Sequence, residues 1–66
     1  MTTFFEAAQV RLILKMKLSQ YNWYKSSVVY MASEGFNVLI FVKKIDDIVR
    51  KTIPQVVNGV YVRMEI

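Results

Sequence analysis

Hydrophobic and polar residues follow several different patterns along this 66-residue chain. Apolar and polar residues nearly alternate over 10–19, whereas every residue over 38–42 is apolar. Apolar residues recur at helical spacing over 45–53 and alternate with more polar ones over 60–66. In the second half of the chain these periods predict a buried strand, a short helix and a strand with one buried face.

The first segment carries a helix-start signal. Thr3, with Glu6 three residues later, has the form of a capping box, so we predict a helix that begins near Thr3. The alternation over 10–18 favours a strand, but the residue types there are mostly good helix formers. A strand over 10–18 therefore stays open as the alternative.

A helix in this segment would carry two apolar stripes. The first consists of Phe5, Ala8, Leu12, Ile13 and Met16, and the second of Val10, Leu14, Leu18 and Tyr21. Both stripes cannot face one small sheet. We predict that the second stripe is left over as an interface.

Residues 23–42 are rich in aromatic and β-branched side chains and are interrupted by Ser33-Glu34-Gly35. This triplet suits a three-residue hairpin loop that ends with glycine in the left-handed region. We predict strands over 25–32 and 36–43. The alternative is a helix over 24–34 that is ended by Gly35.

The short helix near residues 45–53 has Asp46 and Asp47 at its start and basic residues at its end, which complements the helix dipole. Pro54 ends it, and Asn58-Gly59 forms the turn before the last strand. The predicted fold class is α+β, one domain over residues 1–66 in the order α-β-β-α-β. We expect a three-stranded sheet packed by two helices, or the orders β-α-β-α-β or β-β-β-α-β if 10–18 is a strand.

The segment 37–44, the run 46–51, the Ile53-Pro54 step and the final strand entered through Gly59 carry a resemblance. Residues 37–66 resemble a small α-β-β-α-β module of unknown function. This module occurs in standalone bacterial and archaeal proteins and ahead of some trypsin-like protease domains. The resemblance implies a fold, and it implies no catalytic residues.

Composition adds a reason to expect self-association. The apolar fraction is 55%, above the usual ~45–50%. The chain has no cysteine and no histidine, so neither disulfides nor the usual zinc ligands supplement a small core. We therefore expect a homodimer or a higher homo-oligomer. No apolar run approaches the ~20 residues of a transmembrane helix, and we expect a cytoplasmic location.

The residue types do not indicate a catalytic site. General acid-base and thiol chemistry most often use His and Cys, and both are absent. Asp46 and Asp47 have a structural role at a helix start, and Gly35 and Gly59 are too isolated for a phosphate-binding loop. We predict a protein that is not an enzyme and has no cofactor and no bound metal.

The net charge of +4 raises nucleic acid as a candidate partner. The candidate contacts are Arg11, Lys15, Lys17, Trp23, Lys43 and Lys44, with Trp23 as the side chain that would stack on a base. A solvated basic rim explains the same residues. A third interpretation places the first helix on an anionic membrane surface.

The strand over 38–42 is apolar on both faces, so its Leu39 and Phe41 face calls for a covering surface. The predicted oligomer interface consists of Val10, Leu14, Leu18, Leu39 and Phe41. Our leading hypothesis is a non-catalytic, self-associating interaction or accessory protein with an unidentified protein partner. The alternative is a small basic nucleic-acid-binding protein.

Overall fold

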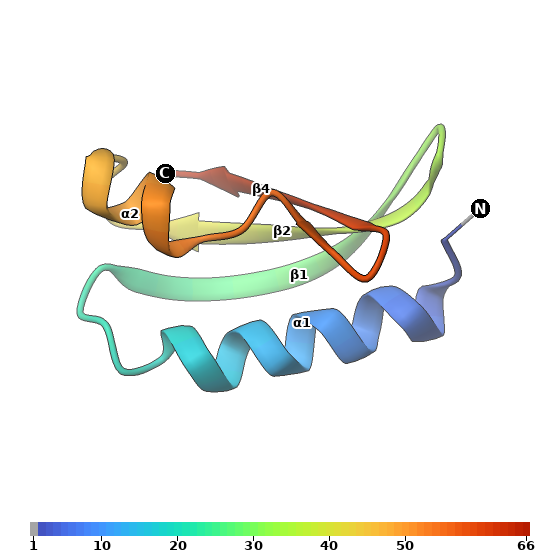
Figure 1. The fold of residues 1–66 in the computed structure, drawn as a ribbon, viewed down its shortest axis with the longest axis horizontal. Helices are drawn as coiled ribbons and strands as arrows, with labels where there is room; N and C mark the ends of the chain where they lie inside the picture. The colour runs from blue at the N-terminus through green and yellow to red at the C-terminus, as the bar shows by residue number, and fades with distance from the viewer. Residues whose placement is uncertain (1) are drawn as a thin grey trace.

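A computed structural model describes residues 2–66 as a long helix packed on a four-stranded sheet (Figure 1). The elements in chain order are α1 (Phe4–Leu18), β1 (Tyr24–Ala32), β2 (Gly35–Val42), α2 (Asp47–Thr52), β3 (Val56–Val57) and β4 (Val60–Glu65). The strand order is β1-β2-β4-β3. β2 pairs antiparallel with β1 and parallel with β4, and β3 pairs antiparallel with β4. The α+β class is confirmed.

The N-terminal segment is helical, so the strand alternative over 10–18 is wrong. The Thr3 hydroxyl accepts from the Glu6 N–H at 3.2 Å, and the Glu6 carboxylate accepts from the Thr3 N–H at 3.0 Å. The predicted capping box is thus present, and it satisfies two backbone donors at the helix start. Lys15 and Lys17 lie in the last turn, where positive charge stabilises the helix.

The central hairpin is confirmed, and the helix alternative over 24–34 is wrong. The loop is shorter than predicted, because Gly35 already pairs with Ala32 and only Ser33 and Glu34 connect the strands. Gly35 has a φ of 124°, a conformation that residues with a Cβ rarely adopt. Glycine is needed here, but at the first position of β2 instead of in the loop.

The predicted three-stranded sheet misses one strand. The two-residue strand β3 pairs with β4 across the Asn58-Gly59 turn, and both turn residues have positive φ values, 50° and 80°. Two successive positive φ values are typical of the two-residue turns that favour Asn-Gly. The chain therefore leaves α2, adds a strand at the outer edge of β4, and returns as β4.

The second helix is shorter than its apolar pattern suggests. Asp46 is its N-cap, and the Asp46 carboxylate accepts from the Val49 N–H at 2.9 Å. Val49 is its buried residue, and Ile53 follows it into the core. α2 lies at the end of the sheet where β2 stops, so among residues 2–66 α1 is the one helix that covers a face of the sheet (Figure 1).

The core lies between α1 and the face of β2 and β4 that carries Val38, Ile40, Val42, Val60 and Val62. Trp23, Val49 and Ile53 close it at the end of the sheet beside α2. No helix within residues 2–66 combines the length and the apolar character that a bilayer crossing needs.

Candidate interaction surfaces

The two apolar stripes of α1 have exchanged the roles that we predicted. Val10, Leu14 and Leu18 are at most 3% exposed, because they pack on the sheet of their own chain together with Ala7. The prediction that they are free for an oligomer interface is therefore wrong. We call these four residues the core stripe.

The opposite side of α1 is apolar and uncovered. Phe5, Leu12 and Met16 are 69%, 52% and 73% exposed, and we call these three residues the outer stripe. Phe4 is also exposed, although its ring meets the ring of Phe36 edge-on, with centroids 5.5 Å apart. Polar residues normally occupy the solvent side of a surface helix. The outer stripe is thus an apolar surface that the fold does not use.

The face of the sheet opposite α1 is a second uncovered surface. Leu39 lies between Val28 on β1 and Arg63 on β4, and Phe41 lies beside Glu65. Directly opposed residues in a sheet share a face, so these side chains form one surface, which we call the open face. Leu39 and Phe41 are half-buried by their neighbours, and Val28 is exposed. The structure places the predicted pair on an uncovered face.

A polar cluster closes one end of the open face. The Asn37 side chain is buried, and its amide donates to the Glu34 carboxylate at 2.7 Å. The Ser33 hydroxyl donates to the same carboxylate at 3.0 Å. The bond from Asn37 has the largest effect on the pKa of Glu34, and together with the bond from Ser33 it lowers that pKa below its ordinary value. Among residues 2–66 the side-chain Oδ1 of Asn37 has no hydrogen-bond partner, and a buried acceptor without a partner costs stability.

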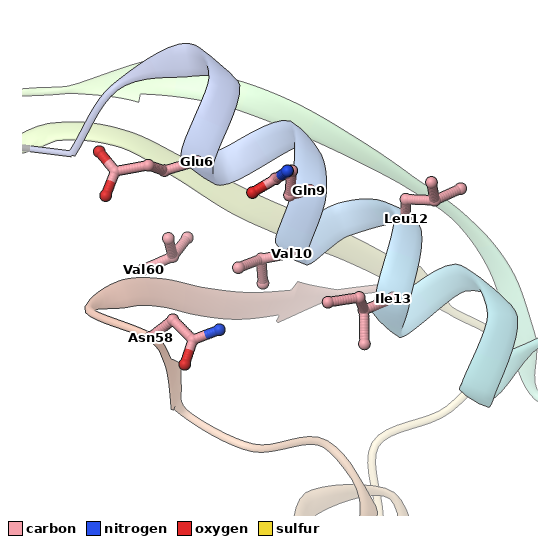
Figure 2. Close-up of a pocket in the computed structure, with 7 residues that line it drawn as sticks. All are labelled: Glu6, Gln9, Val10, Leu12, Ile13, Asn58 and Val60. Carbon is pink, nitrogen blue, oxygen red and sulfur yellow. The ribbon is translucent and has the colours of Figure 1, made fainter.

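A shallow groove of about 400 Å³ runs between α1 and the turn from β3 to β4 (Figure 2). Val10 and Val60 lie on facing sides of it, whereas Leu12 lies at the rim and points away from β4. A hollow of about 390 Å³ continues past Ile13 toward Pro54. The groove exists because α1 lies over β1 and β2 and covers little of β4. Its walls hold one carboxylate, Glu6, which is already bonded to Thr3.

The predicted nucleic-acid contacts are only partly available. Arg11 donates from Nε to the Ser27 carbonyl at 3.0 Å, so its side chain holds α1 against the edge strand β1. Lys44 pairs with Asp46 at 3.3 Å. Lys15, Lys17 and Lys43 are exposed.

Trp23 is not placed as a base-stacking side chain. It is only 6% exposed, and the ring of Tyr21 stacks on it with centroids 4.9 Å apart and planes 13° apart. The predicted stacking role does not fit this position, because the loop after α1 folds the Trp23 ring into the core. Tyr21, which is partly exposed, is the aromatic side chain that this end of the molecule presents.

The carboxylates with shifted pKa values serve the fold. The backbone N–H of Thr3, followed by its hydroxyl, lowers the pKa of Glu6. The Val49 N–H lowers the pKa of Asp46, and Lys44 adds to the effect. Both carboxylates lie at helix starts, Glu6 as the N3 residue of the capping box and Asp46 as the N-cap, where negative charge stabilises the first turn. Within residues 2–66 no three Asp or Glu side chains gather as a metal site would require.

Comparison with known proteins gives no relative: no family model, no curated protein and no solved structure matches this chain.

The surface that sequence reasoning misplaced is the outer stripe. Phe5, Leu12 and Met16 belong to the stripe that we predicted to face the sheet. The pattern shows that α1 is apolar on two sides. It does not show which of these sides packs against the sheet. Arg11 does not resolve the choice, because it lies nearer the core stripe, where its charge by itself would favour solvent exposure of that side.

Proposed function

We propose that this chain is a small non-catalytic interaction protein that associates with itself. The observation that carries the proposal is that α1 is apolar on both sides, with the three large residues of the outer stripe more than half exposed. The solvent side of a surface helix is normally polar, so a second apolar stripe on that side calls for a covering surface. Contiguous exposed apolar surface marks an interaction site more often than scattered single residues do.

The open face supports the same proposal from the other side of the molecule. β2 is the central strand, and its residues are apolar toward α1 and largely apolar away from it. Leu39 and Phe41 remain predicted interface residues, for a second copy or for a protein partner. Arg63 and Glu65 border them, which suits a partner with polar groups as well as apolar ones.

The non-catalytic part of the proposal rests on the side chains present. The carboxylates with lowered pKa values are already bonded, Glu6 and Asp46 at helix starts and Glu34 to Asn37. The resemblance of residues 37–66 to a module without catalytic residues agrees with this. A cytoplasmic location remains part of the same proposal.

Thermal unfolding at several protein concentrations tests self-association. A partner copy that binds only the folded chain raises the unfolding temperature by mass action. We expect the midpoint to rise steadily over a hundredfold range of concentration, about as a dimer–unfolded monomer equilibrium requires. A midpoint that is independent of concentration over that range contradicts the proposal.

Nucleic-acid binding is the second candidate, and one observation favours it. The last turn of α1, the end of β2 and the whole of α2 lie at the same end of the molecule, which gathers Lys17, Lys43, Arg50 and Lys51 there (Figure 1). Against this, Asp46 and Asp47 lie at the same end, and Trp23 is buried.

Salt dependence tests the second candidate. Phosphate contacts release counterions, so binding to single-stranded or duplex nucleic acid must weaken steeply with salt. Tyr21 stacks on Trp23, so a ligand at this end would alter the Trp23 fluorescence. A salt-sensitive change in Trp23 fluorescence that Lys43→Glu abolishes would support nucleic-acid binding at this end of the molecule. No change in fluorescence at low salt would contradict it.

A further inference from the structure

We propose that two copies of this chain pack through the outer stripe of α1, with the two helices antiparallel. This inference rests on the proposed self-association and identifies the surface that would carry it. The occupant of the outer stripe is then the same stripe of a second copy, which makes a two-fold symmetric interface.

The stripe has the shape that helix pairing needs. Each of its residues lies two positions from a core-stripe residue: Phe5 from Ala7, Leu12 from Leu14, and Met16 from Leu18. Two steps of about 100° place each pair on opposite sides of the helix. The outer stripe therefore faces directly away from the sheet, and its spacing of seven and then four residues keeps it along one line of a helix.

The ends of α1 determine the orientation. Its first turn carries Glu6 and its last turn carries Lys15 and Lys17. An antiparallel pair places the acidic end of each helix beside the basic end of the other and opposes the helix dipoles. A parallel pair would place Glu6 beside Glu6 and the lysines beside each other. Glu6 and Lys17 lie on the same flank of α1, beside the hollows between this helix and the β3–β4 side of the sheet, so the helix ends as a whole and not this one pair favour the antiparallel orientation.

Burial separates the outer stripe from the open face as the site of self-association. On the open face, Leu39 and Phe41 are already half-covered by their own chain, and the charged residues Arg63 and Glu65 lie directly beside them. The outer stripe has more exposed apolar side chain per residue, and the charge that borders it, Lys15, is three residues from Leu12 and carries its ammonium group on a long stem that can reach water. Desolvation of the outer stripe therefore costs less than desolvation of the open face.

A matched pair of methionines tests the location of the interface. Met16, on the outer stripe, and Met31, on β1, have the same exposure of 73%, so glutamate at either site removes the same side chain from a similarly open position. We expect Met16→Glu to weaken dimerisation at least about tenfold, because it places a charge in the interface. Met31→Glu should leave the dissociation constant unchanged. Circular dichroism of both variants confirms that the monomer fold is intact.

Cysteine variants test the orientation, because the chain has no cysteine of its own. In an antiparallel pair Phe5 of one copy lies beside Met16 of the other, whereas the two Phe5 residues are about 16 Å apart, beyond the reach of a disulfide. A mixture of Phe5→Cys and Met16→Cys chains should therefore oxidise to the mixed disulfide in preference to either symmetric one. Symmetric disulfides in each separate sample would contradict the antiparallel arrangement.

The outcomes of the methionine test are distinguishable. A wild-type dimer with Met16→Glu monomeric and Met31→Glu dimeric supports the inference. A dimer that keeps its mass in both variants, but dissociates in Phe41→Asp, overturns the inference and leaves self-association intact. A wild-type chain that is monomeric at every concentration overturns both this inference and the proposed self-association. A monomer whose Met16→Glu variant loses binding to anionic lipid vesicles would assign the stripe to a membrane surface instead.

Discussion

At the scale of single residues, the polar side chains of this protein mostly complete backbone hydrogen bonds. Thr3 and Glu6 cap α1, and Asp46 caps α2. Arg11 binds a backbone carbonyl of the edge strand, which leaves fewer free groups on that edge for a foreign strand. These roles explain why residues that a sequence presents as charged candidates for function are engaged in the fold.

The capping box predicts a specific loss of stability. Thr3→Ala removes the hydroxyl that accepts from the Glu6 N–H, so we expect the free energy of unfolding to fall by about 1 kcal/mol. Chemical denaturation measures this. An unchanged unfolding free energy would mean that the first turn of α1 contributes nothing to the folded state.

Three hydrogen-bonded carboxylates, including that of the capping box, predict that the stability of the fold depends on pH in the acid range. Glu6, Glu34 and Asp46 have lowered pKa values in the folded chain, against ordinary values of 4.5 for Glu and 3.8 for Asp. The unfolded chain therefore binds more protons in acid. The stabilisation is complete above the ordinary pKa values and is lost as the pH falls through the folded ones.

We expect Glu6→Gln to reduce the loss of stability between about pH 6 and about pH 3, measured by denaturation at each pH. Glu65→Gln is the matched control, because it removes the same charge without removing a bond of the capping box. Equal pH dependence in wild type and Glu6→Gln would contradict the structural role of that carboxylate.

At the scale of elements, sequence patterns predict what each segment becomes more easily than where its faces point. The capping box, the apolar β2 segment and the acid-to-base polarity of α2 each determine a local structure, and all three are found. The strand β3 was missed because two residues carry no period. Its available signal was Asn58-Gly59 between Val57 and Val60, since this dipeptide favours two-residue hairpins.

The faces of α1 could not be predicted because both are apolar. The choice depends on which residues fit over β1 and β2, and that is a property of tertiary packing. The small Ala7 and the branched Val10 and Leu14 allow close contact between helix and sheet, whereas Phe5 and Met16 are larger and longer. The candidate interface was therefore misplaced on the helix, although the sequence indicated that a surplus stripe exists.

Two leucines on opposite sides of α1 test this assignment. Leu14 is 3% exposed and Leu12 is 52% exposed, so we expect Leu14→Ala to lower the free energy of unfolding of the monomer by about 2–5 kcal/mol. Leu12→Ala should cost the monomer less than about 1 kcal/mol. Denaturation at low protein concentration measures both. Equal losses in the two variants, or a larger loss for Leu12→Ala, would show that the stripes are assigned wrongly.

At the scale of the whole molecule, the fold is a thin body with apolar side chains on both outer surfaces. One helix covers one face of the sheet, and neither the outer stripe nor the open face meets another element of residues 2–66. The core that remains is small, and no disulfide supplements it. Association with a second copy would bury apolar surface that the single chain leaves in water.

The molar mass of the unmodified chain in solution tests this account most directly. Sedimentation equilibrium over a wide dilution series, at low and at high salt, should show twice the 7.8 kDa of one chain at high concentration and dissociation on dilution. High salt should change the dissociation constant little, because apolar burial drives the association and charge only orients it. A mass of one chain at every concentration and both salt levels would contradict the account.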